Sequence, residues 1–170
     1  SVGLELIGIC EHIDVPNSGR EALMERNRDE LAGLAPKVKV LIGAEISMIT
    51  PDRHASTHEF VRTLDYVVIS ANHFHLDPLV QNPAKRTEEG YADWFLLCAV
   101  GAVRAGASII PHPFSYIGVK QMGDGRPVDR ARLLKAYDRG RIRRLFQLAA
   151  ERGTAIELNP HRMGDTEFFR

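Results

Sequence analysis

The sequence predicts an α/β fold built around a parallel sheet. Short apolar runs alternate along the chain with longer segments of helical character, which is typical of parallel strands joined by right-handed crossovers. One of these runs, residues 38–46, is apolar almost throughout, as expected for a strand covered on both faces. The pattern leaves two architectures open, an α/β barrel and an open doubly wound sheet.

The N-terminal part of the chain is expected to form a strand, a helix and a second strand. Residues 4–10 are largely apolar and are followed by polar residues, which marks the first strand and its end. Leucines recur at roughly helical spacing over residues 20–34, and the other face of this segment is heavily charged. This predicts an amphipathic helix, after which residues 38–46 form the second strand.

The central part is expected to contribute the third strand and the most strongly predicted helix. Residues 50–58 are a polar loop, and a short helix around residues 59–64 leads into a strand at residues 65–71. A long loop over residues 72–86 follows, and loops of this length inside compact domains are often functional. The helix over residues 87–103 has a threonine cap and acidic residues in its first turn.

The C-terminal part repeats the same alternation. Residues 107–110 predict the fourth strand, and a second long loop extends over residues 114–127. An aspartate caps a helical region over residues 129–152, which is expected to break near Arg139. A glycine ends this region, and residues 154–158 predict the fifth strand. The whole chain, residues 1–170, is therefore expected to form a single domain.

Composition favours a soluble protein without a general affinity for nucleic acid or membranes. The 22 Lys and Arg residues balance the 22 Asp and Glu residues, so no overall field attracts polyanions. No apolar stretch approaches the roughly 20 residues of a membrane span, and no signal peptide opens the chain. Cys10 and Cys98 lie singly within apolar runs and are expected to be reduced core residues, which favours the cytoplasm.

Residue types that commonly bind metals follow nearly every predicted strand. The carboxyl ends of parallel strands meet at one edge of an α/β sheet, where active sites are found. Imidazole and carboxylate groups are the usual ligands of Zn, Mn and Fe, and a carboxylate can bridge two ions. The residues expected at this edge are His12, Glu45, His73, His112, and Glu157 or Asn159.

The ordered set of strand-end segments resembles the motifs of the PHP (polymerase and histidinol phosphatase) superfamily. A strand ending in Glu/Asp-His, a Gly-x-Glu strand, an Asp-Tyr strand leading to Ser-x-His, a His-Pro motif and a Glu-x-Asn strand occur in the family's order. One extra residue precedes the histidine of the third segment. The corresponding segments are Gly8-Ile-Cys-Glu-His12, Leu41-Ile-Gly-Ala-Glu-Ile46, Asp65-Tyr-Val-Val-Ile-Ser-Ala-Asn-His73, Ile109-Ile-Pro-His-Pro113 and Ala155-Ile-Glu-Leu-Asn159.

The resemblance implies a distorted TIM-like (β/α)7 barrel and a site for two or three divalent ions, Zn, Mn or Fe. It implies hydrolysis of a small phosphorylated substrate by a metal-bound hydroxide, as in a histidinol-phosphatase-like phosphomonoesterase. Glu45 and His73 would be the catalytic residues, with Glu45 bridging two ions. The implied metal ligands are His12, Glu45, His73 and His112, and the implied substrate-binding residues are Asn159, Arg162 and His75.

Two family motifs have no counterpart in the sequence. The superfamily opens with a His-x-His strand and closes with an Asp-x-His strand, and neither is present. Both absences coincide with ends that lack a start methionine, a cap or a closing element. The barrel is therefore expected to be incomplete at both ends, with the chain as a fragment of a longer protein.

Other functions stay open on the sequence alone. One is a non-catalytic PHP-like module that binds a partner or regulates another protein. Another is a PHP nuclease or phosphodiesterase. The neutral charge and the lack of a basic, aromatic-lined groove argue against long nucleic acid as a partner. A third is a different barrel hydrolase acting on C–N bonds, which a lysine ligand or a lone strand-end aspartate would indicate, and neither is visible in the sequence. The oligomeric state is not indicated.

Overall fold

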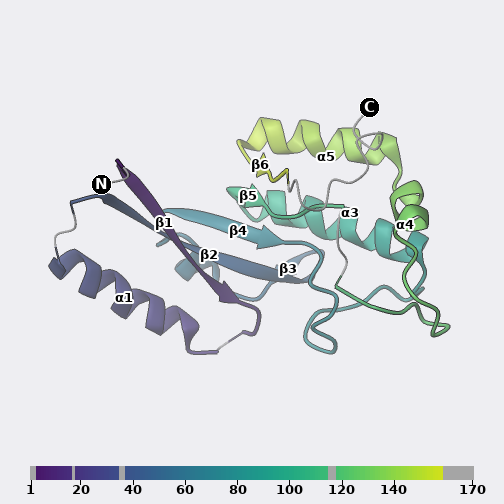
Figure 1. Ribbon diagram of the computed structural model, residues 1–170, viewed down its shortest axis with the longest axis horizontal. Helices are drawn as coiled ribbons and strands as arrows, with labels where there is room; N and C mark the ends of the chain where they lie inside the picture. The colour runs from purple at the N-terminus through teal and green to yellow at the C-terminus, as the bar shows by residue number, and fades with distance from the viewer. Residues whose placement is uncertain (1–2, 17, 35–36, 115–117, 159–170) are drawn as a thin grey trace.

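The computed structural model describes residues 3–16, 18–34, 37–114 and 118–158 and has an α/β architecture (Figure 1). Within these residues, six strands form a single, mostly parallel sheet, and five helices accompany it. The elements in chain order are β1 (Leu6–Ile13), α1 (Arg20–Leu34), β2 (Lys39–Thr50), β3 (Arg53–His54), α2 (His58–Val61), β4 (Tyr66–Ser70), α3 (Glu88–Arg104), β5 (Ile109–Ile110), α4 (Arg130–Ala136), α5 (Arg139–Arg152) and β6 (Ala155–Ile156).

The strands follow one another in the sheet in the order β1-β2-β4-β5-β6, and every neighbouring pair on this path is parallel. The short β3 pairs antiparallel with the end of β2. The predicted α/β class and parallel pairing are therefore confirmed. The described strands form an open sheet with β1 and β6 at its edges, so this part of the chain establishes no closed barrel.

Helix α3 forms the centre of the core. Thr87 caps it by accepting a hydrogen bond from the Gly90 backbone N–H, and Arg104 lies in its last turn, where a cation complements the helix dipole. The helix packs on β2, β4 and β5, while α4 and α5 pack on its other side (Figure 1). Phe95 is fully buried, and its ring lies against those of Phe114 and Tyr137.

Strand β1 is longer and more exposed than the sequence suggests. It extends through His12 to Ile13, because all eight of its residues stay in parallel register with β2. As an edge strand it pairs with β2 and packs beside α1, and a groove of about 270 Å³ is lined by residues of α1, β1 and β2. Cys10 is consequently exposed, so the expectation that it is a core residue was wrong, whereas Cys98 is buried.

Three further segments differ from the predicted boundaries. β2 runs four residues beyond the expected end because it turns into β3, which takes the place of part of the predicted loop. The last two strands, β5 and β6, contain two residues each, fewer than expected. The break between α4 and α5 falls at Tyr137 and Asp138, slightly before the predicted position. Among the described residues, no helix combines the length and the apolar character needed to cross a membrane.

Candidate metal centre

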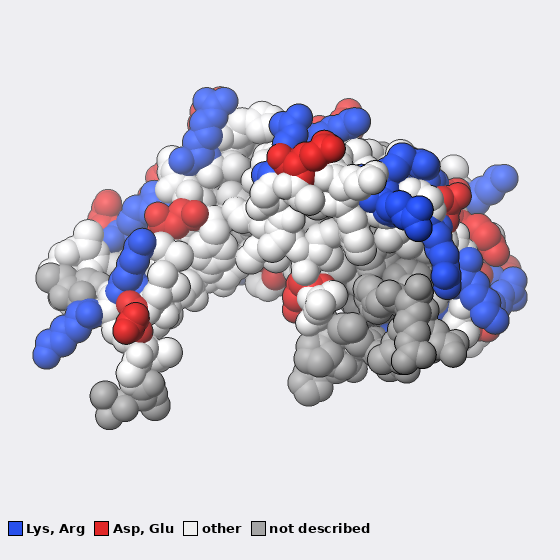
Figure 2. Space-filling model, turned by 90° about the horizontal axis from the view of Figure 1, so that it is seen from above, with Lys and Arg blue, Asp and Glu red and all other residues white. Residues whose placement is uncertain are grey.

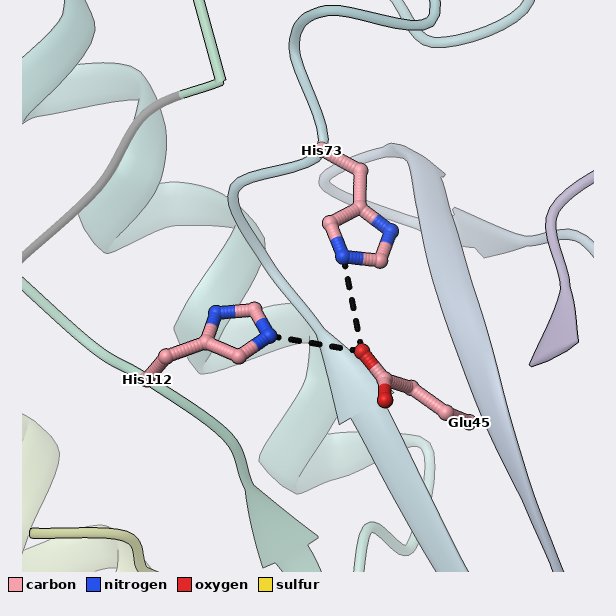
Figure 3. A group of neighbouring side chains, drawn as sticks. All are labelled: Glu45, His73 and His112. Carbon is pink, nitrogen blue, oxygen red and sulfur yellow. Dashed lines mark hydrogen bonds and ion pairs between the residues drawn. The ribbon is translucent and has the colours of Figure 1, made fainter. Parts of the chain in front are cut away.

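Three of the predicted ligands converge at the carboxyl end of the sheet (Figure 3). Glu45 belongs to β2, whereas His73 and His112 follow β4 and β5 within a few residues. Oε1 of Glu45 lies 3.4 Å from Nε2 of His73 and 3.3 Å from Nε2 of His112. The two imidazole rings thus point at the same carboxylate oxygen, although the three residues are far apart in the sequence.

The spacing of these atoms suits a bound ion. One ligand atom from each of the three residues lies within 4.8 Å of the others. Two ligand atoms that each lie about 2.0–2.1 Å from a tetrahedral zinc ion are about 3.3 Å apart, which matches the nitrogen-to-oxygen distances here. Two histidines and one carboxylate leave a fourth position for water or substrate, as catalytic zinc sites do and structural ones do not.

The electrostatics of the cluster favour a cation at its centre. Burial by itself would raise the pKa of Glu45, but hydrogen bonds involving His112, His73 and Ser70 outweigh it and hold that pKa far below the ordinary range. Burial would lower the pKa of His73, yet its contacts with Asp14 and Glu45 raise it to about 9. The same negative groups that stabilise an imidazolium would stabilise a metal ion in its place.

Asp14 is a member of this cluster that the sequence analysis missed. Its Oδ1 accepts a 2.5 Å hydrogen bond from Oγ of Ser47 and lies 3.3 Å from Nδ1 of His73. Oγ of Ser47 also lies 2.7 Å from that nitrogen. Nδ1 of His73 is therefore held by polar groups while Nε2 faces Glu45, the arrangement that orients metal-ligating histidines. The missed signal was that β1 continues to Ile13, which brings Asp14 beside Ser47.

The backbone around His112 is held by two further side chains. Oε2 of Glu157 accepts a 2.5 Å hydrogen bond from the His112 backbone N–H, and Nδ2 of Asn72 donates to its carbonyl oxygen at 3.0 Å. His112 has a φ of 34°, a strained value for a residue other than glycine, and such strain is often found at functional sites. Asn72 therefore positions the backbone of His112. The extra residue that precedes His73 in its motif does not displace His73 from the cluster.

The remaining predicted site residues lie farther out or beyond the described chain. Nε2 of His12 lies 3.6 Å from Oε2 of Glu45, and its side chain is 56% exposed. The His12 ring lies 6.3 Å from that of His73, centre to centre. The ring of His75 lies 5.4 Å from that of His73, centre to centre. Asn159 and Arg162 fall outside the described residues, so their predicted role in substrate binding stays a prediction.

Comparison with protein-family models finds no match for this chain, and comparison with curated proteins finds no significant match either. The PHP resemblance consequently depends on the ordered motifs of the sequence. The geometry of the cluster is independent of that resemblance, because it follows from the register of β1, β2 and β4 and from the positions of the two histidines. What is established is an α/β sheet with a His/Glu group at its carboxyl edge.

Proposed function

We propose that the chain is a metal-dependent phosphoesterase that hydrolyses small phosphomonoesters and belongs to the PHP superfamily. The observation that carries this proposal is the convergence of Glu45, His73 and His112 on one point at the sheet edge. The three side chains supply the donor types that Zn, Mn and Fe prefer, at the spacing a single ion requires. Three protein ligands would leave coordination positions on such an ion for a water molecule and a phosphoryl oxygen.

Glu45 is also placed to bridge two ions. Oε1 faces His73 and His112, whereas Oε2 faces Nε2 of His12. A carboxylate with histidines on both of its oxygens is the arrangement that a dinuclear hydrolase needs, and it supports His12 as a ligand of a second ion. This second position has fewer described ligands than the first, so we expect weaker binding there.

The reaction would depend on bound ions and on side chains that hold the site in place. When bound, the ions would lower the pKa of water towards ~7 and neutralise phosphoryl oxygens. Ser70 donates a 2.5 Å hydrogen bond to Oε1 of Glu45 and so fixes the orientation of the carboxylate. Asp14 and Ser47 orient His73 in the same way. No described residue is needed as a covalent nucleophile in this reaction.

The order of the strands supports the barrel interpretation of the fold. Doubly wound sheets reverse their strand order at a switch point, whereas barrel strands follow one another consecutively, as β1, β2, β4, β5 and β6 do here. We propose that these strands form an arc of a PHP-type barrel. The apolar side chains exposed on the edge strand β1, Leu6, Ile7 and Ile9, are consistent with further chain covering this edge in a complete barrel.

The surface charge supports a small substrate. Figure 2 shows basic and acidic side chains interspersed across one face of the molecule, and acidic groups lie among the basic ones even where the basic ones are most frequent. Long nucleic acid is usually bound by a continuous basic surface. A small phosphorylated molecule needs only the local charge of the site, which the ions themselves would supply.

Metal analysis combined with a phosphatase assay tests the proposal. Purified protein, loaded with Mn, Fe or Zn and freed of excess metal, is expected to retain at least one equivalent and to hydrolyse p-nitrophenyl phosphate. Glu45→Gln keeps the shape of the side chain but removes its charge, and it is expected to lose both properties. His58→Ala is the matched control, because this exposed histidine lies outside the cluster.

Each result has a distinct meaning. Metal bound by the wild type and lost in Glu45→Gln, together with turnover, would support the phosphoesterase. Metal binding without hydrolysis of any phosphomonoester would instead favour a non-catalytic binding module. A folded wild-type protein that retains no metal, or activity that survives the Glu45→Gln substitution, would contradict the proposed centre.

A further inference from the structure

A cavity of about 360 Å³, lined by charged and polar side chains together with apolar ones, lies beside the candidate metal centre, between the loops that follow β4 and β5. The first loop contributes His75, Asp77, Asn82 and Arg86, and the second contributes Lys120 with its neighbours. Tyr91 of α3 and Phe74, both buried, form part of its wall. The sequence led us to expect only His75, among these lining residues, to contact the substrate.

The cavity and the metal centre share a wall. His75 lines the cavity, and its ring lies 5.4 Å from that of His73, which faces Glu45. Gly118 lies directly against His75, and a Cβ atom at this position would collide with Nδ1 of that histidine. The φ of Gly118, +76°, also favours glycine. The backbone of the second loop therefore closes on His75, and a ligand on the metal could extend past this histidine into the cavity.

The charges of the cavity do not cancel. Asp77 is the one carboxylate among its described lining residues, and its Oδ2 lies 2.6 Å from Nη2 of Arg86. Lys120, on the other loop, is a second cation and has no carboxylate counterpart on this wall. One positive charge therefore remains in a concave space, where an anionic group would be favoured.

The amide of Asn82 makes the first loop a firm support. Its Oδ1 accepts a hydrogen bond from the hydroxyl of Tyr91 at 2.9 Å, and its Nδ2 donates to the carbonyl of Phe74 at 3.1 Å. On the second loop, the backbone N–H of Gly123 donates to the carbonyl of Arg86 at 2.8 Å. The two loops that carry the charges are thus tied to α3 and to each other.

We infer that this cavity binds a second anionic group of the substrate, so that the enzyme selects phosphoesters that carry a further carboxylate or phosphate. The reacting phosphoryl group would occupy the metal centre, and the second anion would meet Lys120. This inference rests on the proposed phosphoesterase function. It adds the class of substrate, which the metal centre alone does not define.

Matched substrate pairs test the inference. 3-Phosphoglycerate and glycerol 3-phosphate differ by a carboxylate in place of a hydroxymethyl group, and fructose 1,6-bisphosphate carries one phosphate more than fructose 6-phosphate. We expect a preference of roughly tenfold in kcat/KM for the member with the extra anion in at least one pair, about what one charge-assisted hydrogen bond supplies. The pair that shows the preference distinguishes a carboxylate from a phosphate.

Two substitutions of opposite sign sharpen the test. Lys120→Gln is expected to abolish the preference by raising KM about tenfold for the doubly anionic substrate, with kcat, metal content and the singly anionic substrate unaffected. Asp77→Asn removes the carboxylate that neutralises Arg86, so it is expected to lower the same KM. Lys135→Gln is the control, because Lys135 is an exposed lysine on α4 away from the cavity. This substitution should change neither the substrate preference nor the KM for the doubly anionic substrate.

Failure of this inference can be told apart from failure of the proposed function. Hydrolysis without any preference, or a preference that Lys120→Gln leaves intact, would overturn the inference while the phosphoesterase stands. If no substrate is hydrolysed, calorimetry of 3-phosphoglycerate binding decides the matter. Roughly tenfold weaker binding to Lys120→Gln than to wild type would then support the cavity as an anion site, and equal binding would overturn it.

Discussion

Two regions of the sheet differ in how completely helices cover them. One is the part packed against α3, called the covered side, and the other is the edge formed by β1. β2, β4 and β5 lie beneath α3, and this side contains most of the buried core. β1 lies at the edge beside α1, of which Met24 is the one buried residue, and its apolar side chains are largely exposed. The covered side, packed against α3, is thus closely packed, whereas the edge formed by β1 and α1 is loosely packed.

The candidate ligands follow the same division. The side chains of His73, Glu45 and His112 are 9%, 16% and 23% exposed, whereas that of His12 on β1 is 56% exposed. Ligands held in place by surrounding structure lose less freedom when they bind an ion. The comparison therefore supports the proposal of one well-organised ion position on the covered side and a weaker one at the edge.

Core substitutions on the two sides should differ most. Phe95→Ala on α3 removes a fully buried ring and is expected to lower the free energy of unfolding by about 3–5 kcal/mol. Ile9→Ala on β1 removes a side chain that is already 43% exposed, and we expect a loss of about 1 kcal/mol or less. Urea unfolding of both variants measures the difference, and equal losses would mean that β1 is as firmly packed as α3.

The ion pair of Glu88 and Arg126 attaches the second loop to α3 on the covered side. The carboxylate of Glu88 is inaccessible to solvent and is bound by both terminal nitrogens of Arg126. Glu88→Gln removes the carboxylate that binds both terminal nitrogens of the guanidinium, whose Nε keeps its contact with Asp124. We expect a loss of about 3 kcal/mol at pH 7. Glu89→Gln, the exposed neighbour in the same helical turn, is the control and should cost less than about 1 kcal/mol.

This pair also predicts a dependence on pH. The hydrogen bond from Arg126 lowers the pKa of Glu88 to about 2, against about 4.3 in an unfolded chain. A lowered pKa stabilises the folded state fully above about pH 4.3, and this stabilisation is lost as the pH falls towards 2. The stability difference between wild type and Glu88→Gln should accordingly narrow by roughly half between pH 7 and pH 3. A stability difference that stays constant between pH 7 and pH 3 would contradict the lowered pKa of Glu88.

Substitution of two histidines compares the two ion positions directly. His73→Ala is expected to weaken binding of the first ion by at least about 100-fold, because it removes one of three shielded ligands. His12→Ala should leave this ion bound and weaken only a second, lower-affinity equivalent, by about tenfold. Titration with Zn or Mn followed by elemental analysis separates the two. If His12→Ala removes the first ion as well, the division between the covered side and the edge does not apply to the metal centre.

Local patterns in the sequence predict the parts of the fold that short-range chemistry determines. The threonine cap and acidic first turn of α3 indicated its start, and apolar runs indicated the main strands. His73 and His112 were found because each follows an apolar run directly, before a loop. Parallel strands bring such residues to one edge whatever the length of the crossover, so their convergence could be anticipated.

The boundaries that depend on pairing could not be predicted in this way. Glu11 and His12 look like the end of a strand, yet β1 continues through them because pairing with β2 extends to Ile13 and Ile46. Conversely, β5 and β6 contain two residues each, because strand pairing here is limited to Ile109 and Ile110 of β5 and to the two residues of β6 opposite them. Asp14 was missed for the same reason: its place beside Ser47 follows from the register between two strands, which no local pattern carries.

Asp14 links the loosely packed edge to the shielded site, because it follows β1 directly and contacts His73. Asp14→Asn keeps the size of the side chain but removes the charge that orients Nδ1 of this histidine. We expect metal affinity to fall by about 10–100-fold, the usual cost of losing a group that supports a metal-bound histidine. Because the side chain of Asp14 is 30% exposed, stability should change by less than about 1 kcal/mol.

Two measurements separate a positioning role for Asp14 from a merely structural one. Metal titration of Asp14→Asn should show the weakened affinity, and its far-UV circular dichroism and urea midpoint should match those of the wild type. Asp52→Asn is the matched control, since this exposed aspartate bonds only locally to Thr50 and lies outside the metal-binding group. Unchanged affinity in Asp14→Asn would mean that Ser47 alone is enough to orient His73, and that the edge strand contributes to the site only through His12.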